Sequence, residues 1–272
     1  MKLSKIFALL LALCLISSAA CAATFTDAHG NVIELDDSLE AYAAVTLVGA
    51  DNAARQGETN LGDLWADALR WFAVSGEINA AFDEDDVKAG NDRIAVDAEH
   101  IVALWNGGNL RADIAEGTFG AEALAEVLPF PNKVAVVYMT GAQLLETLEA
   151  ASQRLPYTAE TADACASLMQ VSGLTYTVDT TKAYDALEAY GDHWFTAGSV
   201  SRVRIDDVNG QPFDAEATYA VVTSNANFNG MDSSYVLKAA AEANEQSAVT
   251  TAVVRDVVFQ FIASELNHQV GE

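Results

Sequence analysis

The sequence predicts an α+β fold, in which helices and strands are mixed without a strict strand–helix–strand repeat. Three observations lead to this class. A helical pattern, with apolar residues three and four positions apart, begins near residue 60. Buried or alternating apolar runs typical of strands occupy much of residues 100–224, and helical patterns return after residue 234. With 272 residues, 51% of them hydrophobic, the chain is long enough for one large domain or two small ones.

Residues 1–22 have the pattern of a secretory signal peptide. Lys2 and Lys5 precede an apolar stretch over residues 6–16, and small residues around Cys21 form a cleavage site of the A-x-A type. The apolar stretch is too short to span a bilayer comfortably. We therefore expect an extracytoplasmic protein, secreted or periplasmic, with no membrane span. A lipoprotein anchored through Cys21 is the alternative, ranked second because Ser18 stands where a large aliphatic residue is typical.

Residues 23–54 are expected to form an N-terminal lead-in segment, with a small strand at NVIEL (31–35) and a second apolar run at 42–48. The patterns become regular from residue 55, so 55–268 is expected to be the main domain. Its first helix carries an apolar stripe over residues 61–72 and is capped by Thr59 or Asn60. An acidic loop, FDEDD, follows at 82–86, and HIVALW (100–105) is expected to be a fully buried strand.

The remainder of the main domain is expected to mix short strands and helices. We expect helices at 121–127 and after a Thr140 cap, strands at 133–139, 173–178 and 218–224, a hairpin turn at Asn209-Gly210, and two closing helices. The last of these helices would bury a stripe of four residues: Val253, Val257, Val258 and Phe261.

Composition and motifs exclude several classes of function. The chain has 39 acidic and 14 basic residues, a formal net charge of −25, which argues against binding nucleic acid or an anionic membrane surface. The four histidines share no helix face, and removal of the signal peptide with Cys14 and Cys21 leaves Cys165 as the one cysteine, so no metal site is expected. The sequence also has no P-loop, dinucleotide fingerprint or G-x-S-x-G motif, and we expect no cofactor.

A few polar and aromatic residues at predicted strand ends remain as candidates for a binding site. Loops that follow strands are where ligands usually bind in mixed sheets. Each candidate also has an ordinary structural explanation; Arg111, for example, could pair with Asp113 or Glu116. The candidates are Arg55, Asn106 with its two following glycines, Arg111, Phe130 and Asp232.

Six segments that contain these candidates resemble the C-terminal domain of bacterial and animal 5′-nucleotidases. They are RQGETNLGDLWADA, WNGGNLR, EVLPFPNKVAVVYMTGAQLLETLE, QVSGLTYTVD, RVRI with the following NGQPF, and TYAVVTSNANFNGMD, and the match covers roughly residues 50–268 in the family's order. The resemblance implies a four-layer α/β/β/α sandwich. It also implies a substrate-binding role, because in that family a separate N-terminal metallophosphatase domain brings two metal ions to the phosphate.

The resemblance also implies a role for each candidate. Arg55 and Arg111 would contact the anionic or ribose end of a nucleotide, and Asn106 would contact its base. Guanidinium groups suit this task because they bind phosphate in a bidentate manner. Phe130 matches one of two aromatic residues that enclose the base, and Asp232 matches the acid that accepts hydrogen bonds from the ribose hydroxyls.

The chain departs from the family pattern near its last motif. Ala226 stands where the second aromatic residue is typical, and Phe228, two positions later, is the candidate to replace it. Met231 and Ser233 replace glycines beside Asp232, which removes backbone conformations open mainly to glycine. Weaker or altered recognition of the base is therefore expected.

The largest departure from the family pattern concerns the N-terminal metallophosphatase domain. The 32 residues between the signal peptide and Arg55 leave no room for it. DAHG (27–30) is reminiscent of that domain's first metal motif, but one Asp and one His cannot build a two-metal centre. We therefore expect an exported domain that binds a nucleotide or nucleoside, is inactive alone, and serves nucleotide catabolism by completing a separately encoded metallophosphatase. The alternatives are a non-enzymatic nucleoside-binding module and a degenerate cell-surface module.

Overall fold

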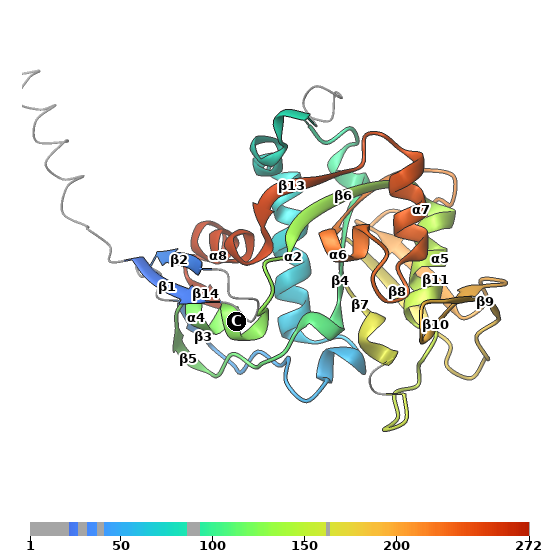
Figure 1. Ribbon diagram of the computed structural model, residues 1–272, viewed down its shortest axis with the longest axis horizontal. Coiled ribbons are helices and arrows are strands. Elements are labelled where there is room, and N and C mark those ends of the chain that lie inside the picture. Colours follow the sequence, from blue (N-terminus) through green and yellow to red (C-terminus); the bar gives the residue numbers. More distant parts are fainter. Residues whose placement is uncertain (1–21, 27–31, 37–40, 86–92, 162–163, 272) are drawn as a thin grey trace, which may run out of the picture.

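The computed structural model (Figure 1) describes residues 22–26, 32–36, 41–85, 93–161 and 164–271. The expected signal peptide, with Cys21, lies outside this part of the chain except for its last residue, and so does the DAHG motif. None of the described helices is long and apolar enough to cross a membrane.

A five-stranded mixed sheet forms the centre of the molecule. Its strands, in order across the sheet, are β13 (Ala248–Val253), β6 (Lys133–Thr140), β12 (Thr218–Ser224), β4 (Ile101–Asn106) and β7 (Met169–Ser172). β12 runs parallel to β4, whereas the other neighbouring strands are antiparallel. Successive residues of β12 face opposite sides, so that Val221 belongs to one hydrophobic cluster and Val222 to the other. The sheet is therefore buried on both faces.

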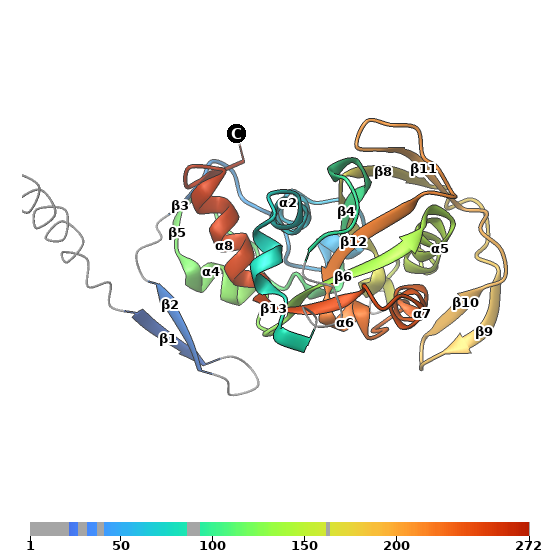
Figure 2. The ribbon, with the colours of Figure 1, turned by 90° about the horizontal axis from the view of Figure 1, so that it is seen from above.

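Helices cover both faces of this sheet (Figure 2). One face packs against α2 (Asn60–Val74) and α8 (Val254–Ser264), and α4 (Ala121–Val127) packs against α8. The other packs against α5 (Gly141–Ala151), α7 (Tyr235–Ala243) and an antiparallel pair, β8 (Leu174–Val178) and β11 (Val203–Val208). This arrangement confirms the α+β class, while the finer four-layer description stays a prediction.

The remaining elements lie around the central sheet. They are the antiparallel pair β1 (Ala22–Thr26) and β2 (Val32–Asp36), the sheet of β3 (Ala41–Ala43), β5 (Gly117–Phe119) and β14 (Gln269–Val270), the pair β9 (Ala186–Tyr190) and β10 (Trp194–Ala197), and the short helix α6 (Asn225–Phe228). β3 pairs with β5 and β14, and Leu47 is buried in the core beside Ile114. The second half of the lead-in segment thus packs against the main domain.

The two best-defined helix starts follow the predicted capping chemistry. The Thr59 hydroxyl accepts a hydrogen bond from the Gly62 N–H at 3.1 Å, so Thr59 caps α2. Thr140 and Gln143 form a reciprocal capping box at the start of α5. The apolar stripe predicted for α2 is buried along its whole length. Both helices are therefore confirmed.

Two predicted elements differ from the structure. The Asn209-Gly210 turn forms, but the returning segment makes only the bridge Val208–Gln211, and β11 pairs with β8 instead. Pro212 has no N–H, which prevents the ladder from continuing. Val253, predicted to begin the stripe of the last helix, ends β13, which separates the two closing helices.

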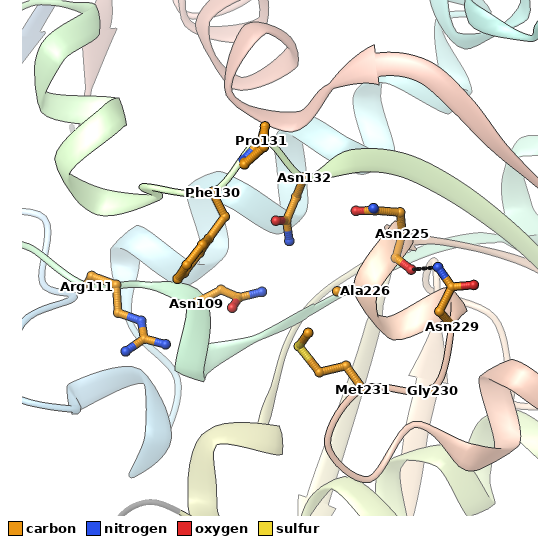
Figure 3. Close-up of a pocket in the computed structure, with 10 residues that line it drawn as sticks. All are labelled: Asn109, Arg111, Phe130, Pro131, Asn132, Asn225, Ala226, Asn229, Gly230 and Met231. Carbon is orange, nitrogen blue, oxygen red and sulfur yellow. Dashed lines mark hydrogen bonds between the residues drawn. The ribbon is translucent and has the colours of Figure 1, made fainter. Parts of the chain in front are cut away.

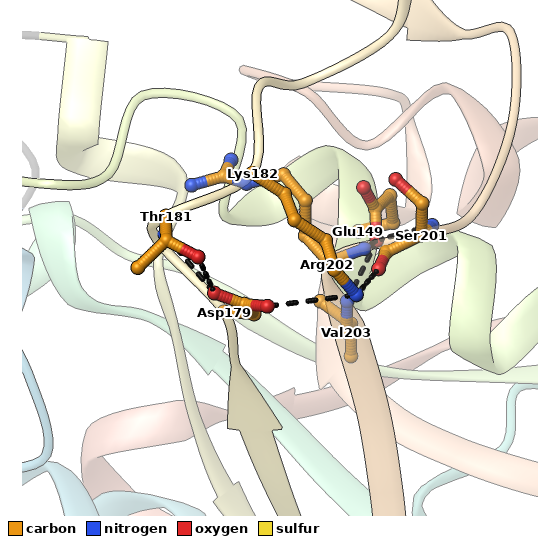
Figure 4. Close-up of polar contacts among 7 residues, drawn as sticks. All are labelled: Glu149, Asp179, Thr181, Lys182, Ser201, Arg202 and Val203. Atoms are coloured by element: carbon orange, nitrogen blue, oxygen red, sulfur yellow. Dashed lines mark hydrogen bonds and ion pairs between the residues drawn. The ribbon is translucent and has the colours of Figure 1, made fainter.

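A buried polar cluster fastens the end of α5 to the start of β11 (Figure 4). Glu149 is fully buried, and its Oε2 accepts hydrogen bonds from the backbone N–H groups of Ser201, Arg202 and Val203 at 3.3, 2.9 and 2.8 Å. The Arg202 guanidinium in turn donates to the carbonyl oxygens of Ser152 and Leu155 at 2.9 and 2.8 Å. This cluster satisfies backbone groups that β11 leaves unpaired where the strand begins.

Candidate functional site

The candidate residues gather where β4 and β12 end. Because these neighbouring strands are parallel, the segments that follow them leave the sheet at the same edge. The Asn106 Nδ2 atom, at the end of β4, donates a hydrogen bond to the Asp232 Oδ2 atom at 3.2 Å, although the two residues are 126 positions apart. The topology of the sheet therefore joins two of the predicted site residues.

Arg55 reaches this edge through a different segment. It ends the 3-10 turn Ala53–Arg55 and is only 8% exposed. A side chain of β7, Gln170, holds the segment in place: its Nε2 donates to the carbonyl oxygens of Ala54 and Gly57 at 3.0 and 2.9 Å, and its Oε1 accepts from the Thr59 N–H at 2.9 Å. Gln170 thus positions Arg55.

The two glycines after Asn106 allow two other segments to come close, the Arg55 segment at Gly107 and the turn Ala164–Ser167 at Gly108. A Cβ atom at Gly107 would collide with the Ala54 carbonyl oxygen, and one at Gly108 would lie 2.5 Å from the Ala166 Cβ atom. Close backbone approach, rather than a left-handed conformation, therefore explains this glycine pair.

Electrostatic interactions join Asp232 to two arginines. Burial raises the pKa of the Asp232 carboxyl, while Arg55, the hydrogen bond from Asn106, and Arg111 lower it. Burial and the neighbouring Arg55 lower the pKa of the Arg111 guanidinium, and Asp232 opposes that shift. Asp232 adopts a left-handed φ of 55°, a conformation that aspartate tolerates better than most residues. Two positive groups and one negative group thus converge at this edge.

A pocket of about 840 Å³ opens beside these charged groups (Figure 3). The Arg111 Cζ atom lies 5.6 Å from the centre of the Phe130 ring, within the range of a cation–π contact. Phe130 and Met231, which is 51% exposed, lie on two sides of the pocket in Figure 3. The lining residues are Asn109, Arg111, Phe130, Pro131, Asn132, Asn225, Ala226, Asn229, Gly230 and Met231.

The six predicted site residues occupy three kinds of position. Arg111 and Phe130 line the pocket. Arg55, Asn106 and Asp232 interact with one another or with Arg111 but do not line it. Phe228, on α6, packs against the hydrophobic cluster of α5 and α7 and is not a lining residue.

Sequence reasoning missed Gln170 and the four asparagines of the pocket wall. Gln170 is a polar residue in a buried strand, which is an unusual placement and could have drawn attention. Asn109 ends the turn after β4, Asn132 precedes β6, and Asn225 and Asn229 lie at the two ends of α6, so no spacing rule relates these three segments. Among the described residues, no three His, Cys, Asp or Glu side chains lie close enough together to hold a metal ion.

Comparison with known proteins gives one consistent family. Residues 40–239 match the family described as 5′-nucleotidase, C-terminal domain. The trifunctional nucleotide phosphoesterase protein YfkN of Bacillus subtilis (strain 168) is 27% identical over 188 residues, which are 68% of this chain and 10% of that protein. The apyrase of Tabanus yao is 29% identical over 134 residues, which are 48% of this chain and 22% of the apyrase.

A solved structure agrees with these sequence relatives. The 5′-nucleotidase precursor from Thermus thermophilus is similar with a TM-score of 0.60 and 29% identity, and the similarity covers 85% of this chain and 37% of that one. The chain therefore spans a minor part of the length of each of these relatives.

Proposed function

The chain belongs to the 5′-nucleotidase C-terminal domain family, and we propose that it binds a nucleoside or nucleotide in the pocket between Phe130 and Met231. A volume of about 840 Å³ lies within the usual range for small-molecule sites. The pocket wall contains the aromatic ring of Phe130 and the amide groups of four asparagines. These groups suit the flat ring and the polar edges of a nucleobase.

The single observation that carries this proposal is the convergence of Arg55, Arg111 and Asp232 beside Phe130. A base stacked on Phe130 would place its sugar toward this charged edge. Asp232 would then accept hydrogen bonds from ribose hydroxyls, and the guanidinium groups would attract the phosphate. In a chain with a net charge of −25, such a local pair of cations offsets the repulsion that an anion meets on approach.

The chemical step is proposed to depend on a metallophosphatase domain outside these 272 residues. The acidic and histidine side chains of the described part do not fit a two-metal centre. In this proposal the chain holds the nucleotide while a separately encoded domain hydrolyses it, as a step of nucleotide catabolism. Chelator-sensitive hydrolysis of AMP by the purified chain alone would contradict this division of roles; hydrolysis that needs an added metallophosphatase domain is the expected result.

Calorimetric titration with adenosine and AMP tests the binding site. We expect saturable binding, and about a tenfold or greater loss of AMP affinity in Arg111→Ala, because a charge-assisted hydrogen bond is removed. Arg154→Ala is the matched control, since the Arg154 Cζ atom lies 5.7 Å from the Phe195 ring centre in a similar pair outside the pocket. Equal losses in both variants would contradict the assignment.

The same titration tests a second candidate function, a degenerate module that keeps the fold of the family but no longer binds a nucleoside or nucleotide. Ala226 is the observation that favours it, because this residue lines the pocket but offers no second aromatic face. Absence of heat with both ligands, from a chain that unfolds cooperatively, would support this candidate and exclude the first.

Export is part of the proposal and rests on the pattern of residues 1–22 alone. We propose cleavage after Ala22, which gives a secreted or periplasmic protein. Mass spectrometry of the chain recovered from the extracytoplasmic fraction should find Ala23 at the N-terminus. A lipid-modified Cys21 would instead identify a lipoprotein, and an uncleaved cytoplasmic chain would contradict export.

A further inference from the structure

Met231 is the exposed methionine of the part of the chain that the structure describes. Its exposed fraction is 51%, whereas Met139 and Met169 are each only 3% exposed. The sulfur atoms of these two methionines also have hydrogen-bond donors in the core, a threonine hydroxyl of α5 at 4.0 Å and an asparagine amide of α6 at 3.9 Å, respectively. An oxidant in solution therefore reaches the thioether of Met231 before it reaches the other two.

The side chain of Met231 forms part of the pocket wall. The Met231 N–H donates a hydrogen bond to the Ala226 carbonyl oxygen at 3.0 Å, and the Ser234 N–H donates to the Met231 carbonyl oxygen at 3.0 Å, so the backbone is held on both sides. In Figure 3 the sulfur end of the side chain extends away from its own loop toward the interior of the pocket, with Phe130 on the other side. A ligand that fills the space between Phe130 and Met231 therefore contacts this thioether.

Met231 is also the largest apolar side chain that α6 and the loop after it contribute to the pocket. Ala226 offers a single methyl group, and the other lining residues of this segment are asparagines and a glycine. Phe228, the aromatic residue of the same segment, packs in the cluster of α5 and α7 instead. A polarisable thioether suits contact with an aromatic ring, so Met231 is the apolar partner of a base on this side.

The thiol of Cys165 does not compete for an oxidant. Cys165 is 2% exposed, and its Sγ atom donates a hydrogen bond to the Arg154 carbonyl oxygen at 3.4 Å. Burial also raises the pKa of this thiol, which disfavours the reactive thiolate. The exposed thioether is thus the more accessible of these sulfur groups.

We propose that Met231 is an oxidation site, and that its conversion to methionine sulfoxide by a peroxide weakens ligand binding in the pocket. The sulfur attacks one oxygen of hydrogen peroxide; an S–O bond forms as the O–O bond breaks, the proton of the transferred oxygen passes to the departing hydroxide, and water leaves. The sulfur loses two electrons and the peroxide gains them. The product places a polar S–O group where an apolar contact stood, and covering it with a base costs desolvation. The effect on binding rests on the proposed function, whereas the oxidation itself does not.

Peptide mass spectrometry of the purified chain after treatment with hydrogen peroxide tests the site. The peptide that carries Met231 should gain one oxygen well before those that carry Met139 and Met169. Saturating adenosine should slow this gain about fivefold or more, because the bound ligand covers the sulfur. Oxidation of the three methionines at equal rates would overturn the assignment of the site.

Calorimetric titration of the oxidised chain tests the effect on binding. We expect its affinity for adenosine to be about tenfold lower than that of the untreated chain, and treatment with methionine sulfoxide reductases should restore it. Equal affinities before and after oxidation would overturn this part of the inference and leave the proposed function standing. Absence of binding by the untreated chain would overturn both, while the mass spectra would still decide the site.

Two variants assign the loss to its source. Met231→Leu keeps an apolar side chain of similar volume but has no sulfur at this position, so peroxide should not change its affinity, whatever the starting value. Met139→Leu, the matched change at a buried methionine, should remain as sensitive as the unmodified chain. A tenfold loss that persists in Met231→Leu would overturn the assignment, and the reversal by the reductases tests it without any substitution.

Discussion

The Phe130 ring lies beside Arg111 in the pocket wall, and this side chain supplies the aromatic face of the site. Its backbone lies in the turn before β6, between two prolines. Proline restricts the backbone on both sides of Phe130, so the backbone that carries the ring is constrained before any ligand binds.

At the residue scale, we predict different results for two phenylalanines. Phe130→Ala should weaken nucleoside binding by about 1–3 kcal/mol, because a stacking face is lost, and should also lower the free energy of unfolding, since Phe130 packs against the core. Phe228→Ala should leave the affinity nearly unchanged and lower the free energy of unfolding, since Phe228 packs in the cluster of α5 and α7. Titration and chemical denaturation measure both quantities. The reverse pattern would show that Phe228 is the residue that contacts the base.

Asp63, in the first turn of α2, gives a prediction on pH. Burial, with smaller contributions from Glu58 and Asp67, raises its pKa to about 6. The folded protein thus holds this proton more tightly than the unfolded chain, so ionisation of Asp63 lowers stability as the pH rises through about 6. Asp63→Asn should raise the free energy of unfolding by about 1 kcal/mol near neutral pH, after allowance for solvent screening, and the gain should vanish near pH 4.

Asp179 provides a control of opposite sign for that measurement. Hydrogen bonds from Thr181 lower the pKa of the Asp179 carboxyl. Asp179→Asn should therefore lower stability at neutral pH rather than raise it. Denaturation curves recorded at several pH values measure both variants; a gain in Asp63→Asn that persists at about pH 4 would contradict the electrostatic explanation.

The residues of the site differ in how far the sequence reveals them. Arg111 and Phe130 lie in motifs shared with a known family, so their place in the pocket wall could be expected. The role of Gln170 could not, because it depends on contacts with a segment that only the folded chain brings near. Asn106 was expected at the base, but it is 2% exposed and both ends of its amide contact protein groups.

At the scale of elements, the pair of β9 and β10 supports the loop that carries Asp232. Tyr190, the last residue of β9, donates a hydrogen bond from its hydroxyl to the Gly230 carbonyl at 2.7 Å. Its ring centre lies 5.6 Å from that of Tyr235, whose hydroxyl donates to the Glu146 Oε1 atom at 2.8 Å. Gly230 lines the pocket at a φ of 88°, a conformation that favours glycine, so this contact holds a tight turn at the wall.

We predict that Tyr190 is a positioning residue for the ligand. Tyr190→Phe keeps the ring and removes the hydrogen bond to Gly230, so nucleoside affinity should fall about fivefold. The melting temperature should change little, which separates positioning from a general loss of structure. Leu187→Ala is the control on the same strand, since Leu187 is 67% exposed and should affect neither quantity. An unchanged affinity in Tyr190→Phe would contradict the prediction.

Elements with strong periodicity could be predicted, and elements without it could not. α2, β4 and β12 carry long apolar patterns because they are buried in the core, and the structure confirms them. Nearly all residues of β9 are exposed, so buried and exposed positions do not alternate along it. Nothing in its sequence therefore distinguishes it from a loop. β13 ends at Val253 and α8 begins at Val254, so an apolar residue at helical spacing from Val257 is in fact the end of the strand; spacing alone does not locate this boundary.

At the scale of the whole molecule, the excess of acidic residues should limit stability at low salt. The net charge is −25, and ion pairs such as Lys182–Asp179 and Lys238–Glu242 lie at the surface, where they contribute little. Raising the salt concentration from about 20 mM to about 300 mM shortens the range of the repulsion among the acidic groups. The melting temperature should therefore rise by several degrees. A lower melting temperature at high salt would show that attractive ion pairs outweigh the repulsion among acidic groups.

The claim that the whole molecule is organised to hold a nucleoside is tested most directly by a crystal structure of the chain grown with adenosine or AMP. The account predicts the base against Phe130, the sugar toward Asp232, and the phosphate of AMP toward Arg55 and Arg111. An empty pocket at saturating ligand, or a nucleoside bound elsewhere on the surface, would contradict it.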